Sequence, residues 1–446
     1  MSHKQLHLGA ILSGVGTSQN AWLEPGLPGD ASIDINWYIE NARLAEAAKF
    51  DLVFIVDSPF ITPDTAPHFL NRLEPLTLLS ALAVSTSKIG LVGTLTTSYW
   101  EPFNVARQFA SLDLISRGRA GWNVVTTGLE GASRNYGRED HFPHADRYRR
   151  AGEFLDVVKG LWDSYEDDAF PRDRASGTFL DKSKQHRLDH QGEFFSVAGP
   201  LNISRSRQGQ PVIFQAGESD QGRAFGAQIA EGIYSNAESF ETAREYYQDV
   251  KARAVRLGRD PDHIAILPGL IPIIADTEAQ ALAIEEAENG KLDFAKALVQ
   301  LGRPFNYHDF AQYDADAPFP DVSHLTLNSY KGHAERIVRT ARTEGLTLRE
   351  TAWRFAARSN PFVGTAKTVA DEIERWFIGG ACDGFNYRIS APEPFARFVR
   401  EVVPILQERG LFRTEYTHDT LRGHLGLPFV DNRYAAAEHL NSIAAE

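Results

Sequence analysis

The sequence predicts an α/β protein folded as a (β/α)8 (TIM) barrel with long insertion loops. Short apolar runs typical of strands alternate with amphipathic helical patterns, eight such runs occur, and most are followed by a helix. An open doubly wound sheet is the alternative, but it needs fewer strands and a glycine-rich turn after the first one. Gly14-Val15-Gly16 is not that turn, because no third glycine opens a helix behind it. We therefore favour the barrel.

Each strand is predicted from a β-rich apolar run bounded by polar or turn residues. The clearest is the run 52–56, which lies between Asp51 and Asp57. The eight predicted strands cover 6–12, 51–57, 89–94, 116–127, 211–216, 232–236, 264–274 and 384–390.

Each helix is predicted from apolar residues that recur at helical spacing, as Ile35, Tyr38, Ile39 and Ala42 do in the first one. Helical patterns also fill much of 277–358. The remaining predicted helices cover 33–49, 75–84, 103–115, 145–164, 221–231, 240–257, 367–378 and 395–408.

The chain is predicted to form one domain over 1–446, because no internal repeat or linker divides it. Two stretches break the alternation: 166–210 is charged and irregular, and 302–330 is rich in Pro, Asp and aromatic residues. Loops of this length in a compact domain usually cover or bind something. The tail, about 412–446, has no strand pattern and is expected to wrap the surface or a neighbouring subunit.

Composition excludes several classes of protein. The formal net charge of −13 argues against nucleic acid or an anionic membrane as the main partner. Cys382 is the only cysteine, which excludes an internal disulfide and a cysteine-cluster metal site. No apolar run approaches the length of a membrane span, and the N-terminus has no signal-peptide core. A cytoplasmic location is expected.

The strand ends carry neutral polar residues, with few acids among them. In a barrel the active site lies at the C-terminal ends of the strands, and a flat heterocycle with amide-like groups suits such hydrogen-bonding side chains better than a metal does. The residues predicted at these ends are Ser13, Asp57, Thr94, Asn123 to Thr127, Gln215 to Ser219, Asn236 and Asn386.

Ser219 stands where a helix N-cap is expected, so the following N–H groups could attract a phosphate. An ordinary serine cap is the alternative. His141 and His144 could form a zinc pair, but no further ligands follow at matching spacing, so two surface histidines are the simpler interpretation and no metal site is predicted. No Gly-x-Ser-x-Gly elbow and no Walker sequence is present.

Five segments together resemble the bacterial-luciferase-like flavin monooxygenases, in the branch of nitrilotriacetate and dibenzothiophene-sulfone monooxygenases. The likeness runs over nearly the whole chain, and it is carried by 116–127, 143–148, 199–202, 215–223 and 422–427.

The resemblance implies a two-component enzyme in which a separate NAD(P)H:flavin reductase supplies reduced FMN. Reduced FMN and O2 would then oxygenate a C–H, C–N or C–S centre of a small organic substrate. It also implies a homodimer or homotetramer. Catalytic residues are not assigned. The residues implied to bind FMN are Asp57, Thr94 and Asn123 at the ring, His144 and Tyr148 against the flavin, and Ser219 with the backbone of Glu218 at the phosphate.

One departure concerns the loop after the first strand. The family often carries a histidine before the Ala-Trp pair, whereas this chain has Thr17-Ser18-Gln19-Asn20 before Ala21-Trp22. Substrate handling at that loop is therefore left open. The alternatives are a deazaflavin-dependent oxidoreductase on the same barrel, a non-catalytic flavin-binding protein and a metal-dependent barrel hydrolase.

Overall fold

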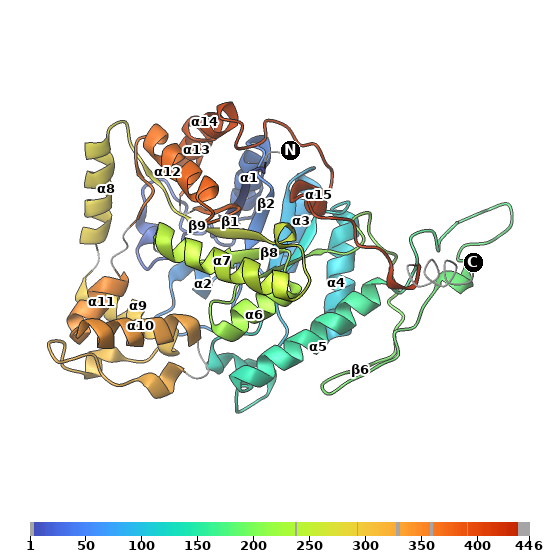
Figure 1. The fold of residues 1–446 in the computed structure, drawn as a ribbon, viewed down its shortest axis with the longest axis horizontal. Helices are drawn as coiled ribbons and strands as arrows, with labels where there is room; N and C mark the ends of the chain where they lie inside the picture. The colour runs from blue at the N-terminus through green and yellow to red at the C-terminus, as the bar shows by residue number, and fades with distance from the viewer. Residues whose placement is uncertain are drawn as a thin grey trace.

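Eight parallel strands close into a barrel at the centre of the computed structural model (Figure 1). The structure describes residues 4–236, 239–291, 293–326, 331–356, 360–389 and 391–435. Around the barrel the strand order is β1-β12-β9-β8-β7-β4-β3-β2, so the predicted fold class and all eight predicted strands are confirmed. The barrel strands are β1 (His7–Leu12), β2 (Leu52–Ile55), β3 (Gly90–Thr96), β4 (Ala120–Val125), β7 (Val212–Gln215), β8 (Gly232–Ser235), β9 (Ala265–Leu270) and β12 (Gly384–Ile389).

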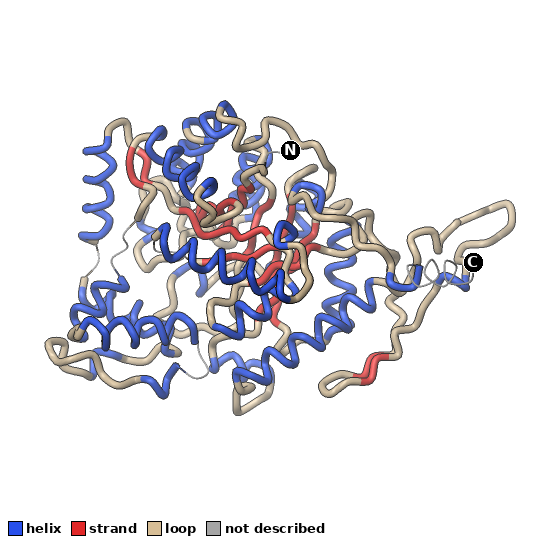
Figure 2. The backbone as a smooth tube through the Cα atoms, in the orientation of Figure 1, coloured by secondary structure: helices blue, strands red, loops and turns tan. Residues whose placement is uncertain are grey.

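Helices surround the strands (Figure 2), and most begin at a side-chain cap. Asp34, Ser239 and Thr365, for example, each accept a hydrogen bond from a backbone N–H of the first turn. The outer helices are α1 (Ile35–Ala47), α3 (Pro75–Ser85), α4 (Pro102–Ile115), α5 (His144–Trp162), α6 (Asp220–Ile229), α7 (Phe240–Arg256), α12 (Ala366–Ile378), α13 (Pro392–Glu401) and α14 (Val403–Glu408).

Two details of the prediction are wrong. The last helix is not continuous, because Pro404 in the first turn of α14 lacks an N–H and breaks the ladder near Val402. The seventh predicted strand ends at Leu270, and the following β10 (Ile273–Ile274) pairs with β11 (Val363–Gly364) outside the barrel. The short helix α2 (Pro67–Leu70) was not predicted.

The apolar core has two layers, because successive strand residues point to opposite faces. On β1, Leu8, Ala10 and Leu12 pack outward against the helices, whereas Ile11 points into the lumen. The lumen is filled rather than open. Its buried apolar residues are Ile11, Leu52, Phe54, Val92, Val212, Phe214, Ala265, Leu267, Leu421, Leu425 and Leu427.

The tail does more than wrap the surface. Its short helix α15 (Leu421–His424) inserts Leu421 into the lower end of the lumen, where the side chain is fully buried. A Cβ on Gly90 or Gly121 would come within 2.4 Å or 3.0 Å of Leu421, so these glycines make the space. Arg422 then pairs with Glu231, with N–O distances of 2.5 and 3.1 Å.

The two predicted insertions leave the barrel on different sides. The segment 166–210 forms an extended arm that carries the small hairpin β5 (His190–Gln191) and β6 (Ser196–Val197) (Figures 1 and 2). The segment 302–330 belongs to a helical unit with its own apolar core. Its part at 327–330 lies outside the described residues. The helices of this region are α8 (Glu278–Gly290), α9 (Phe294–Gly302), α10 (Lys331–Glu344) and α11 (Leu348–Ala356), with short 3-10 turns at Arg303–Phe305, Phe310–Gln312 and Ser323–Thr326.

Within the described ranges, no helix combines the length and the apolar character needed to cross a lipid bilayer.

Candidate active site

Thr94 and Asn123 lie side by side at the upper end of the lumen. They are paired across β3 and β4, and the Asn123 amide donates to the Thr94 hydroxyl over 2.9 Å. Asn123 is 3% exposed, yet its Oδ1 has no hydrogen-bond partner among the described residues. A buried acceptor without a donor costs about 1–3 kcal/mol. The pair is therefore suited to a ligand that brings an N–H group to this point.

The turn between β7 and α6 forms a tight backbone cradle. Ser219 is the N-cap of α6 and accepts a hydrogen bond from the Gly222 N–H over 3.1 Å, as predicted. A Cβ on Gly217 would lie 2.6 Å from the Gly222 Cα, so the turn requires glycine at this point. Its free N–H groups and the positive end of the helix dipole favour an anion.

The helical unit also reaches this turn. Gly332, the second residue of α10, lies so close to the turn that a Cβ there would come 2.7 Å from the Ser219 nitrogen. Glu218 is fixed from another side, because its Oε1 accepts a hydrogen bond from the Asn236 N–H over 3.1 Å. Sequence patterns contained no signal for the contact with Gly332, which joins segments more than one hundred residues apart.

His144 and Tyr148 stand beside the same turn, one helical turn apart at the start of α5. Their ring centroids are 5.1 Å apart, and Tyr148 packs edge-on against Phe225 of α6 at 5.5 Å. His144 Nδ1 is hydrogen-bonded to Gln221 Oε1. The structure thus brings four predicted residues together: His144, Tyr148, Glu218 and Ser219.

Asp57 follows β2, next to the strand that carries Thr94. It forms an ion pair with Arg72 at 2.5 Å. Burial raises the pKa of the Asp57 carboxyl, although Arg72 opposes that shift. The carboxylate therefore has its own cation and stands at the rim of the opening.

Aromatic rings form the floor beneath these polar groups. Phe54 packs edge-on against Phe214 at 5.9 Å and lies 6.4 Å from the ring of Tyr234. Asn386, which was predicted at the mouth, instead lies fully buried inside the lumen, where its Nδ2 donates to the Leu267 carbonyl. The predicted strand 384–390 agrees with β12, but Asn386 is its third residue and lies well before the C-terminal end of the strand.

A second polar network lies just beyond β4. Thr127 has a φ of +47°, a strained conformation for a β-branched residue. Its carbonyl accepts hydrogen bonds from Arg147 and from His141 Nε2. Tyr99 donates to His141 Nδ1, and burial together with Arg147 lowers the pKa of His141 to about 4. His141 is thus a neutral, half-buried structural residue and not the surface histidine that the sequence suggested. Neither its burial nor the strain at Thr127 could be predicted from the sequence.

His141 and His144 do not point to a shared metal ion, since each has other hydrogen-bond partners. Across the described ranges, no three His, Cys, Asp or Glu side chains gather in a way that could hold a metal.

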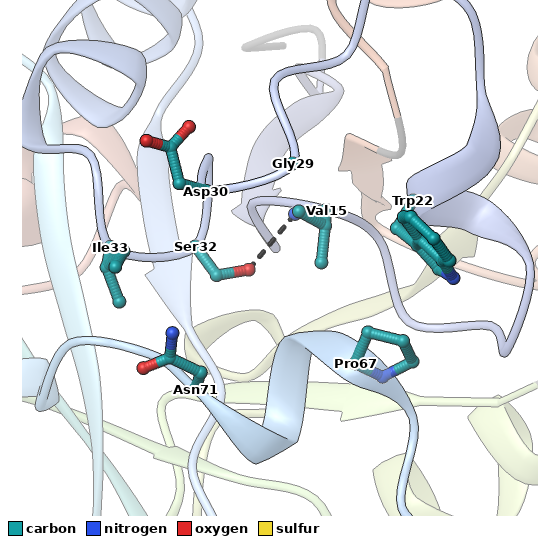
Figure 3. Close-up of a pocket in the computed structure, with 8 residues that line it drawn as sticks. All are labelled: Val15, Trp22, Gly29, Asp30, Ser32, Ile33, Pro67 and Asn71. Atoms are coloured by element: carbon teal, nitrogen blue, oxygen red, sulfur yellow. Dashed lines mark hydrogen bonds between the residues drawn. The ribbon is translucent and has the colours of Figure 1, made fainter.

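A pocket of about 160 Å³ opens beside the loop after β1 (Figure 3). Trp22 and Pro67 face each other across it, and Ser32 accepts a hydrogen bond from the Val15 N–H over 3.1 Å. The departure at Thr17–Asn20 immediately precedes Ala21-Trp22, so the altered loop borders this pocket. The lining residues are Val15, Trp22, Gly29, Asp30, Ser32, Ile33, Pro67 and Asn71.

Comparison with known proteins gives consistent matches. A family model described as luciferase-like monooxygenase matches residues 16–381. N-acetyl-S-(2-succino)cysteine monooxygenase of Bacillus subtilis (strain 168) is 47% identical over 97% of this chain and 99% of its own. Nitrilotriacetate monooxygenase component A of Aminobacter aminovorans is 40% identical over 97% and 99%. Among solved structures, a riboflavin lyase with modified FMN and riboflavin superposes with a TM-score of 0.84, at 32% identity over 96% and 97% of the two chains.

Proposed function

This chain belongs to the luciferase-like monooxygenase family, and from that membership we propose that it is the oxygenase component of a two-component system. The prediction that it is a monooxygenase using reduced FMN and O2 is confirmed by its relatives. The supply of reduced FMN by a separate NAD(P)H:flavin reductase is the proposed part. The word "component" in the name of the Aminobacter relative supports it.

The residues at the barrel opening fit FMN. The unpartnered Asn123 Oδ1 offers an acceptor for a ring N–H, with Thr94 beside it. The α6 N-terminus, with Ser219 and the Glu218 backbone, offers donors for the phosphate. Gly332 packs so closely against that turn that a side chain at position 332 would collide with it. The unpartnered buried acceptor carries the assignment, because a native buried polar atom normally has a partner.

Bound reduced FMN supplies the two electrons that activate O2, so that one oxygen atom enters the substrate and the other leaves as water. The chain's own contribution is placement. Thr94 and Asn123 orient the ring edge, Ser219 anchors the phosphate, and the Phe54 and Phe214 rings exclude water from below. His144 and Tyr148 border the flavin, with Asp57 at the rim.

We propose that the enzyme works in the cytoplasm, where NAD(P)H is available to the reductase, and that it assembles as a homodimer or homotetramer. The extended arm at 166–210 supports an assembly, because an isolated chain gains little by projecting it from the barrel. Sedimentation velocity of the purified protein would test the assembly.

The decisive test is oxygen transfer. With a flavin reductase, NADH and FMN, substrates drawn from thioethers, amines, sulfones and chlorinated aromatics are supplied under 18O2. The panel includes N-acetyl-S-(2-succino)cysteine and nitrilotriacetate. We expect one labelled atom in at least one product. Oxygen consumption that yields only hydrogen peroxide with every substrate would contradict the proposal.

His144→Ala is expected to lower product formation at least tenfold while leaving the melting temperature within about 2 °C. His144 is only half-buried and lies at the first residue of α5, so its loss removes little packing. Product yield per NADH and a thermal melt measure the two effects. His263→Ala, at an exposed turn after α7, is the control. An unchanged product yield in His144→Ala would show that His144 has no role at the active site.

Gly332→Ala is expected to weaken reduced-FMN binding about tenfold. The new Cβ would push α10 away from the Ser219 amide, because a side chain forced into a filled space displaces its neighbours. Anaerobic titration with reduced FMN measures the affinity. Gly290→Ala, where a Cβ would meet nothing within 4 Å, is the matched control, and equal affinities for both variants would refute the contact's importance.

A further inference from the structure

Arg388 projects into the upper lumen from β12, the strand between β1 and β9. It is paired with the inward-facing Ile11 and stands two residues beyond the buried Asn386, on the same face of the strand. Its Nη2 donates to the hydroxyl of Tyr234 and, over 3.1 Å, to Oδ1 of Asn236. The guanidinium is thus fixed at the barrel opening by two neighbours from β8 and the loop that follows it.

Gly269 of β9 makes this arrangement possible. A Cβ at that position would lie 2.9 Å from the Tyr234 hydroxyl and 3.3 Å from Arg388 Nε. The strand between Arg388 and Tyr234 therefore contributes no side chain, which lets the two meet across it. Such a gap at the upper end of a packed lumen is a specific feature, since barrel interiors are normally filled by bulky side chains.

The hydrogen-bond partners of the Arg388 guanidinium are neutral, so they do not balance its positive charge. Neither Tyr234 nor Asn236 carries a negative charge, and across the described ranges no carboxylate forms an ion pair with Arg388. Arg72 and Arg422, by contrast, are paired with Asp57 and Glu231. In the same ranges Nε and Nη1 of Arg388 make no hydrogen bond, and the side chain is only partly buried. Nη2 is engaged by both neighbours, so Nη1 is the end of the held guanidinium that is suited to a charge-assisted hydrogen bond to a carboxylate.

Two anions could reach this point: the FMN phosphate and an acid group of the substrate. The phosphate already has the α6 N-terminus after β7, and β12 is separated from β7 by β8 and β9. Arg388 shares the aromatic floor with the proposed ring site, because Tyr234 lies beside Phe54. The position favours the substrate.

We propose that Arg388, held by Tyr234 and Asn236, binds a carboxylate of the substrate, and that the substrate class is small organic acids carrying an oxidisable thioether or amine. This inference rests on the proposed function. Arg388 sets specificity and takes no part in oxygen activation.

The test compares acids with their neutral carboxamides. The probes are N-acetyl-S-(2-succino)cysteine and nitrilotriacetate, each with its fully amidated analogue. Their binding to the full-length protein with oxidised FMN is measured by calorimetry, and turnover is measured in the reductase-coupled assay. We expect wild type to prefer at least one acid about tenfold or more over its amide, consistent with a charge-assisted hydrogen bond to a guanidinium.

Arg388→Gln is expected to raise Kd and KM for that acid about tenfold and to abolish the preference over the amide, with kcat within twofold. Arg388→Lys, which keeps the positive charge but not the planar guanidinium, is expected to restore part of the preference. Arg400→Gln, on the outer helix α13, is the control for loss of a surface charge. A preference retained in Arg388→Gln, or no preference for either acid in wild type, would overturn the proposal.

A separate arm distinguishes the two anions. If Arg388 served the FMN phosphate, Arg388→Gln would weaken binding of FMN but not of riboflavin, and the proposal would be wrong. The outcome is also separable from the proposed function. If the enzyme oxygenates substrates without preferring acids, the proposed monooxygenase function stands and the inference about Arg388 is wrong. If acids bind in an Arg388-dependent way but are not oxygenated, the inference about Arg388 stands and the proposed function is wrong.

Discussion

Ser219→Asp is expected to weaken reduced-FMN binding on the order of 100-fold without unfolding the enzyme. Asp is as good an N-cap as Ser, so the hydrogen bond to the Gly222 N–H and the start of α6 are retained. The new carboxylate would face the phosphate. Two unit charges about 5 Å apart repel by roughly 3 kcal/mol at an effective dielectric constant near 20, which corresponds to about two orders of magnitude in affinity.

Anaerobic fluorescence titration with reduced FMN measures this loss, and raised salt is expected to recover part of it. Ser219→Asn is the matched control, because it caps the helix, has nearly the same shape as Asp and carries no charge. Ser239→Asp places the same charge at the N-cap of α7 and tests for a general effect. Equal affinities for Ser219→Asp and Ser219→Asn would exclude a phosphate at this turn.

Arg422→Met is expected to lower the free energy of unfolding by about 3–5 kcal/mol at pH 8. Glu231 lies behind this arginine, where its Oε2 also accepts a hydrogen bond from the Ile213 N–H over 3.0 Å. Removing one partner of a buried ion pair leaves the other charge uncompensated. Equilibrium denaturation by urea measures the loss, and flavin affinity is expected to remain unchanged, since the pair lies at the opposite end of the barrel.

The loss is expected to shrink at lower pH. Burial acts to raise the pKa of Glu231, but Arg422, together with Lys159 and the Ile213 N–H, outweighs it and holds that pKa below its usual value. The wild-type pair therefore stabilises the fold above the unfolded-state pKa and weakens as pH falls through the folded one. Without Arg422, burial raises the pKa of Glu231, so the folded variant gains a proton on acidification and recovers stability. Arg422→Met with Glu231→Gln is expected to be more stable than Arg422→Met alone, and a difference that does not depend on pH would contradict this account.

The sequence by itself determined the barrel and predicted part of the candidate site. Strand runs, helix periods and caps are local patterns, so the eight strands and the cap at Ser219 could be predicted within a few residues. The segment around Asn123 was predicted as a site wall because polar side chains ended a buried strand, and the unpartnered Asn123 Oδ1 is the structural counterpart of that prediction.

Only the tertiary structure decided what meets across long stretches of chain. Leu421 fills the lower end of the lumen, and Gly332 packs against the Ser219 amide. Arg388 contacts Tyr234 across Gly269, which has no side chain. Each contact requires either a glycine in another segment, which leaves space for it, or a distant segment of the chain that folds back to this point. Local sequence propensity does not predict which distant residues meet. Their packing is determined by the space that remains once the barrel has closed and the helices have packed around it.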